Sequence, residues 1–295
     1  MHLNKGANHK MTVTSKFGKS LAIAAILGTV IIGGSTTTKA AETQEYKSDA
    51  AVNFITNTDP TDPVDPEDPD PGKPVDPIDP IDPTDPIEPG TDGPLSIDFA
   101  SSFNFGTGKI TTKDTTYQAY AQQIKQNDDN ENPTKENYRP NYVQVTDNRG
   151  TEAGWDLKVK QEQQLTSTEG TELKGAVIKM TNGTLSTAAG STAPAPTGES
   201  EVTLVPGGEA AVVAAAAKGQ GAGLWSNYFG SSDTTLAAGT DLKPGATEED
   251  QPTEFNVIRN SAVTLSVPGA SVKTKSKYTT ELTWVLSEVA ANGGN

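Results

Sequence analysis

Proline recurs at nearly every third position between Thr58 and Pro89, and the residue before it is usually aspartate. The segment reads TDPTDPVDPEDPDPGKPVDPIDPIDPTDPIEP. Each proline fixes its own φ and moves the preceding residue out of the α-helical region, so a helix is excluded here. Polyproline II geometry remains open, and at about 3.1 Å per residue the segment would span on the order of 100 Å. We expect an acidic, disordered or polyproline II spacer over residues 41–93, without fixed contacts.

About 200 residues follow from Pro94 onward, enough to bury a core. Short segments rich in β-branched residues and bounded by Gly, Asn or Pro predict strands. They read LSIDF, NYVQVTD, GWDLKVK, GAVIKMTNG, SEVTLVPGG, EFNVI, SAVTLSVPG and YTTELTWVLSEV. AYAQQIKQ is a candidate short helix, and GEAAVVAAAAKGQG is open to helix or strand. We predict one all-β domain over residues 94–295, an antiparallel β-sandwich or partly closed barrel.

The N-terminus has the pattern of an export signal. A basic leader without acidic residues precedes the apolar run LAIAAILGTVIIGG, which is too short and too rich in glycine for a typical membrane span. Cleavage after Ala40 places Thr38 and Ala40 at the two positions that need small residues. We expect residues 1–40 to be a removed signal peptide and the protein to be secreted. The alternative is an uncleaved membrane anchor.

Composition excludes several kinds of active site. The chain has no cysteine, and its two histidines, His2 and His9, lie in the leader. Thiol nucleophiles, histidine bases and His or Cys metal sites are therefore unavailable to the exported chain. A carboxylate pair of the glycosidase kind remains, but no spacing indicates one. We expect no enzyme, no cofactor and no metal site. The acidic segment NDDNENP (Asn127 to Pro133) lacks the glycine of an EF-hand loop.

The charge of the chain bears on its partners. The formal net charge is −15, and without the five leader lysines it falls to about −20. Such a surface repels phosphate backbones, so we expect no nucleic-acid partner.

The triplet Trp-x-Leu occurs twice, at Trp155–Leu157 and at Trp284–Leu286. Side chains on a strand alternate between its faces, so in each motif the indole and the leucine share the apolar side. The alternation favours two tryptophans that anchor a core. The other interpretation is an exposed platform on which sugar rings stack.

At these residues the chain resembles the WxL-domain surface proteins of low-GC Gram-positive bacteria. The matching segments are GPLSIDFASSFNFG, YVQVTDNRGTEAGWDLKVKQ and TELTWVLSEVA. The resemblance implies noncovalent attachment to the cell wall with peptidoglycan as the ligand, and motif residues Trp155, Leu157, Trp284 and Leu286. It also implies complexes with other WxL proteins and a membrane-anchored companion, and contact with host matrix proteins. The family's second motif often leads to a terminal proline, which SEVAANGGN lacks.

The third tryptophan lies in the glycine-flanked segment GQGAGLWSNYFGSS. The flanking glycines predict a loop, and loops often carry binding residues. Trp225, Tyr228 and Phe229 are therefore candidates for contact with a sugar or a partner, or for pinning the loop to the core.

Three functions remain open. The first is a wall-binding surface module, and the second is a structural subunit or adhesin whose main partner is protein. The third is a carboxylate glycosidase that acts on wall glycan. The sequence has no LPxTG-like sorting signal and no C-terminal apolar tail, so we expect the folded domain to provide attachment.

Overall fold

The computed structural model describes residues 44–84, 86–125, 135–242 and 254–289. The chain divides into two units, Met1–Val52 and Asn53–Asn295, and all strands below belong to the second. The predicted signal peptide and the segment NDDNENP lie outside the described residues. Within the described ranges, no helix is long and apolar enough to cross a membrane.

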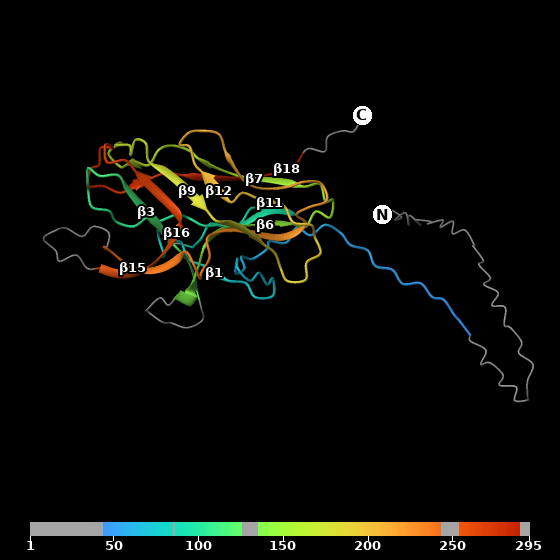
Figure 1. Cartoon of the computed structure of the whole chain (residues 1–295). Coiled ribbons are helices and arrows are strands. Elements are labelled where there is room, and N and C mark those ends of the chain that lie inside the picture. The colour runs from blue at the N-terminus through green and yellow to red at the C-terminus, as the bar shows by residue number, and fades with distance from the viewer. Residues whose placement is uncertain (1–43, 85, 126–134, 243–253, 290–295) are drawn as a thin grey trace, which may run out of the picture. The chain divides into compact units, whose positions relative to one another are not determined.

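The second unit is built from antiparallel sheets (Figure 1). The β7 sheet has the order β11 (Thr197–Gly198), β13 (Ala211–Ala216), β7 (Trp155–Gln161) and β18 (Leu282–Glu288). The β6 sheet has the order β10 (Gly183–Ser186), β14 (Gly223–Phe229), β6 (Asn141–Asp147) and β2 (Leu95–Ala100). The β16 sheet has the order β12 (Glu201–Thr203), β9 (Val177–Thr181), β16 (Glu254–Val267) and β15 (Leu236–Leu242), and β3 (Thr115–Tyr120) also pairs with β16.

Two smaller sheets complete the unit. One has the order β1 (Asp76–Pro77), β4 (Gln122–Lys125) and β5 (Tyr138–Arg139), and the other pairs β17 (Tyr278–Thr279) with β8 (Thr166–Ser167). The described residues contain one helical turn, the 3-10 turn η1 (Lys135–Asn137). The prediction of an all-β, antiparallel, sandwich-like fold is confirmed.

Side chains from the three large sheets meet in one apolar core. Its buried members include Trp155 from β7, Val143 from β6, Trp225 from β14, and Ile178 and Val263 from the β16 sheet. On β7 the burial alternates strictly, with Trp155, Leu157, Val159 and Gln161 buried and the residues between them partly exposed. The period of two that the sequence shows is therefore the period of burial.

One segment differs from the sequence-based expectation, and the structure refines two others. The candidate helix AYAQQIKQ is wrong, because its described residues end β3 and form β4. The alanine-rich segment, open to either structure, contains the strand β13, which is paired with β7. EFNVI and SAVTLSVPG join as the single long strand β16. In each case pairing with a distant strand decides the structure, and local propensity does not.

The Asp-Pro repeat folds locally through its aspartates. In four Asp-Pro-X triplets, the Oδ1 atom of the aspartate accepts a hydrogen bond from the backbone N–H of residue X. These aspartates are Asp65, Asp70, Asp79 and Asp82. Such Asx turns need a short acceptor side chain and tolerate proline at the next position. The repeat thus encodes a series of turns, in which the backbone holds these four carboxylates.

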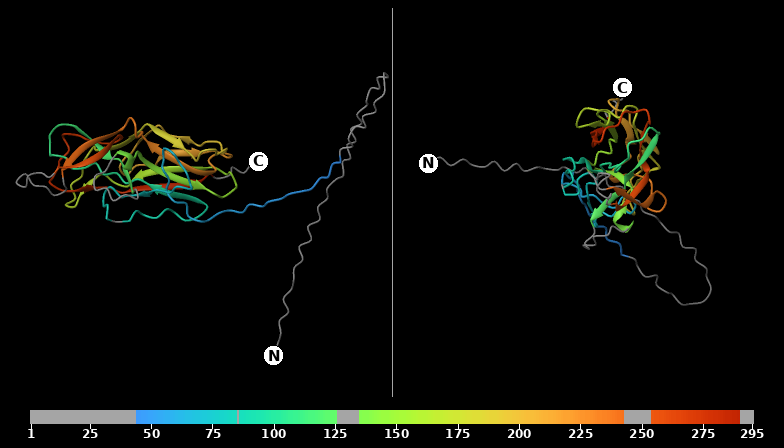
Figure 2. Two further views of the ribbon diagram at one scale, coloured as in Figure 1. Left: turned by 90° about the horizontal axis from the view of Figure 1, so that it is seen from below. Right: turned by 90° about the vertical axis from the view of Figure 1, so that its left-hand side faces the viewer.

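Residues 63–80, called the Asp-Pro strap below, pack along one face of the domain (Figure 2). Val64 is only 1% exposed, and its N–H donates to Oε1 of Gln144 at 2.8 Å. Asp65 pairs with Arg139 at 2.6 Å. At its other end β1 pairs with β4, and Asn104 donates to the carbonyl of Pro80 at 2.6 Å. The interpretation of this stretch as an extended solvated spacer is therefore wrong; whether the wall-binding part begins at residue 94 stays a prediction.

A buried carboxylate supports the face on which the strap lies. Asp98 accepts hydrogen bonds from the hydroxyls of Ser96 and Thr146, at 2.7 and 2.6 Å, and from the amide of Gln144 at 2.9 Å. Burial raises the pKa of Asp98, because the carboxylate loses water, while these hydrogen bonds act in the opposite direction. Gln144 is thereby held between Asp98 and the strap residue Val64. The strap position thus depends on residues far along the chain.

Candidate functional site

The two Trp-x-Leu motifs lie on neighbouring antiparallel strands, β7 and β18 (Figure 1). In the register of this pair, Leu286 lies opposite Leu157, and Trp284 lies opposite Val159. Directly opposite residues project from the same face of a sheet, so the motif side chains point together toward the core. The two copies of the triplet therefore lie on paired strands, with only their leucines directly opposite each other.

The first motif is in the interior of the fold. Trp155 is 0% exposed, and its Nε1–H donates to the carbonyl of Gly221 at 3.0 Å. Gly221 has φ +73°, and a Cβ there would lie 2.7 Å from Nε1 of Trp155. Since β7 is paired on both sides, by β13 and β18, the backbone of this motif is also enclosed. Trp155 and Leu157 are therefore residues of the core.

The second motif lies at the edge of the same sheet. Trp284 and Leu286 are half-buried against the core. In an antiparallel ladder, alternate residues bond to the partner. Glu162 N–H donates to Glu281 O, and Val289 N–H donates to Gly154 O, so the odd-numbered residues of β18 bond toward β7. The N–H and C=O groups of Leu282, Trp284 and Leu286 therefore point to the open side, where no backbone partner is found among the described residues.

The predicted ligand loop around Trp225 is instead the strand β14, next to β6 in the sheet. Trp225 and Phe229 are buried in the core, and Tyr228 is partly exposed on the opposite face. The indole N–H of Trp225 donates to the carbonyl of Ala222 at 3.0 Å. The indoles of Trp155 and Trp225 thus donate to the carbonyls of two consecutive residues, Gly221 and Ala222, just before β14. A role of these three residues in binding stays a prediction.

Arg149 joins the end of β18 to the turn before β7. Its guanidinium pairs with the buried Asp147 at 2.7 Å and with Glu288 at 3.2 Å, and it donates to the carbonyl of Gly154 at 2.9 Å. The hydrogen bond and charge of Asp147 raise the pKa of Arg149. The terminal strand is thereby held at its last residue by charge, in addition to its ladder with β7. The role of Arg149 could not be predicted from the sequence, because nothing near it in the chain indicates a partner at Glu288.

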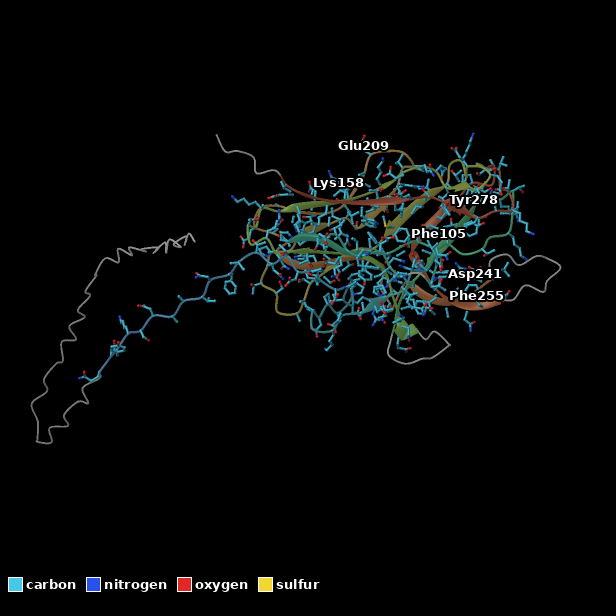
Figure 3. The ribbon with its side chains drawn as sticks, turned by 180° about the vertical axis from the view of Figure 1, so that it is seen from behind. Phe105, Lys158, Glu209, Asp241, Phe255 and Tyr278 are labelled. Carbon is cyan, nitrogen blue, oxygen red and sulfur yellow. The ribbon has the colours of Figure 1, made fainter. Side chains whose placement is uncertain are left out.

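The outer face of the β7 sheet carries a row of side chains across three strands. Lys158 on β7 lies opposite Val212 of β13 and Val285 of β18, and both valines are exposed. Lys158 forms no ion pair within the described residues, whereas the neighbouring Lys160 pairs with Glu162 at 2.6 Å. Figure 3 labels Lys158 at the surface of the domain. This outer face combines an apolar floor with a cation in an acidic protein.

Gly154, directly before the first motif, gives a stability prediction with a matched control. It has φ +85°, and a Cβ there would lie 2.3 Å from the carbonyl oxygen of Ala216. We expect Gly154→Ala to destabilise the domain by more than about 2 kcal/mol, since left-handed strain of about 1–2 kcal/mol adds to this clash. Gly170 has the same φ of +85° with no atom within 4 Å, so Gly170→Ala should show the strain alone. Equal losses in urea unfolding would contradict the clash.

Comparisons with known proteins agree with this arrangement. A family model described as WxL domain surface cell wall-binding matches residues 41–289. No curated protein and no solved structure matches the chain. The matched range includes both Trp-x-Leu motifs and the Asp-Pro strap, and confirms the family that the motifs indicate. The chain therefore belongs to the WxL domain family of surface proteins that bind the cell wall.

Proposed function

We propose that residues 1–40 direct export of the chain and are then removed. The exported chain attaches noncovalently to peptidoglycan through its folded unit. The observation that carries this proposal is the wall-binding family match over residues 41–289. The sequence has no cysteine and has histidine only in the leader, so a thiol nucleophile or a histidine base is unavailable to the exported chain. The chain then acts as a binding module and not as an enzyme.

We place the ligand on the outer face of the β7 sheet. Val212 and Val285 offer an apolar floor for the faces of sugar rings, and the ammonium of Lys158 lies between them. Wall peptides carry carboxylates, which a lysine without an internal ion pair can bind. Asp156, Thr283 and Ser287 on the same face add acceptors and hydroxyl donors for a polar ligand. This face therefore provides both kinds of contact that a glycan with acidic peptides needs.

Sedimentation with purified walls tests the function. The chain of residues 41–295 should sediment with intact walls and also with peptidoglycan freed of its attached anionic polymers. Sedimentation with intact walls alone would assign the ligand to those polymers and contradict peptidoglycan as the ligand. No sedimentation with either would overturn the proposed function.

A charge reversal tests the proposed face. Lys158→Glu should weaken wall binding by about tenfold, the equivalent of one charge-assisted hydrogen bond of about 1.5 kcal/mol. The control is Lys275→Glu, which makes the same charge change at an exposed lysine outside the large sheets. Equal weakening in both variants would indicate a general charge effect and exclude a specific role of Lys158.

The alternative from the sequence, a subunit whose main partner is protein, is favoured by a different observation. The outward backbone groups of β18 form an open sheet edge, and such edges bind added strands.

A further inference from the structure

The segment Ala51–Thr56, before the strap, is unusually apolar for an exposed part of this chain. Its side chains Val52, Phe54 and Ile55 are 72%, 89% and 93% exposed. The sequence AVNFIT combines β-branched and aromatic residues, which favour strands, yet it pairs with no strand in the described residues. Exposed apolar segments of this kind mark interaction sites.

The segment Ala51–Thr56 lacks a partner strand, and the edge of β18 offers backbone groups with which a strand can pair. The N–H and C=O groups of Leu282, Trp284 and Leu286 point outward from the sheet, and the side chains of these residues are half-buried against the core. A strand added beside β18 would satisfy these backbone groups and cover the exposed parts of Trp284 and Leu286. We call Ala51–Thr56 the donor segment and the edge of β18 the acceptor strand. The two complement each other in both backbone and side chains.

The structure places the base of the donor segment near the end of the acceptor strand. Thr56 donates through its hydroxyl to the carbonyl of Arg149 at 3.2 Å. The guanidinium of the same Arg149 pairs with Glu288, the last residue of β18. If two molecules meet at this end about a twofold axis, the segment of each begins beside the edge of the other. Such geometry favours a closed, reciprocal exchange of identical segments.

Charge does not oppose contact at these two sites. The exported chain carries a net charge of about −20, which disfavours association in general. Yet neither AVNFIT nor LTWVLS, residues Leu282 to Ser287, contains a charged residue. We propose that Ala51–Thr56 of one molecule adds as a strand to the open edge of β18 in a second copy, so that the protein forms a dimer by exchanging these segments. This inference goes beyond attachment to the wall and does not depend on it.

The first test measures association of the chain of residues 41–295 by sedimentation velocity. We expect a concentration-dependent dimer that tightens as salt screens the net charge. Phe54→Asp should raise the dimer dissociation constant at least tenfold, because it places a charge in an apolar strand contact. Ile110→Asp, at another exposed apolar residue, should leave the constant unchanged. A chain that stays monomeric up to about 100 µM at high salt, or equal effects of both variants, would overturn the proposal.

The second test locates the contact and separates exchange from binding within one molecule. The chain has no cysteine, so introduced thiols have only each other as partners. Asn53→Cys should be combined in turn with Thr283→Cys, Val285→Cys and Ser287→Cys, whose side chains lie on the outer face of β18. Oxidation of one of these pairs should give a covalent dimer. A disulfide within a monomer, or no cross-link in any pair, would contradict exchange with a second copy.

Discussion

Replacing Trp155 with alanine should lower the free energy of unfolding by about 3–5 kcal/mol, a large share of the roughly 5–15 kcal/mol of a typical domain. The indole is fully buried, and its hydrogen bond to Gly221 would be lost with it. For a unit of this size, the melting temperature should fall by about 10 °C, measured by circular dichroism or calorimetry.

The other two tryptophans provide a graded comparison for that result. Trp225→Ala should cost nearly as much as Trp155→Ala, because Trp225 is also in the core. Trp284→Ala should cost less, about 1–2 kcal/mol, since its side chain is only half-buried on an edge strand. A larger loss at Trp284 than at Trp155 would contradict the different positions that we assign to the two motifs.

Deleting Thr58 to Pro89 is the second change from which we expect a large effect. It removes the buried Val64, the ion pair of Asp65 with Arg139 and the strap hydrogen bonds to Gln144. Burial of one valine is worth about 1.5–3 kcal/mol, and the polar contacts add about 1 kcal/mol each. We therefore expect the deleted chain to lose about 3–5 kcal/mol of stability, measured by urea unfolding.

A point variant separates loss of the strap contact from the effect of a shorter chain. Val64→Asp places an unpaired carboxylate beneath the strap and should destabilise the domain by more than about 2 kcal/mol. Val272→Asp makes the same change at a valine that is 69% exposed, and should change stability by less than about 0.5 kcal/mol. If Val64→Asp were as mild as this control, the strap would not be held as the structure shows.

The alternation of β7 could be predicted from the sequence. A strand buried on one face imposes a period of two, and Trp155, Leu157 and Val159 follow it without interruption. The strand β14 could not be predicted in the same way, because the glycines around it indicate a loop. Gly223 and Gly230 have φ +79° and +96° and lie at the start and just beyond the end of that strand, so they delimit it and do not disrupt it.

Other features depend on contacts that no local pattern contains. The Asp-Pro repeat has little apolar content, and its docking depends on Gln144 and Arg139, which lie far along the chain. Only the strand order shows that β18 is an edge strand and that β7 is an inner strand of the same sheet. The two copies of one triplet could thus be recognised from sequence, but their different environments could not.

The unequal burial of the three tryptophans also gives the chain a built-in optical reporter. Trp155 and Trp225 are enclosed and donate their indole N–H groups to the adjacent carbonyls of Gly221 and Ala222. Trp284, half-buried at the sheet edge, remains partly open to solvent. A dissolved quencher should therefore reach one fluorophore and spare two. Light emitted by the accessible indole would then report on events at the β18 edge, while the emission of the other two would change only when the core itself opens.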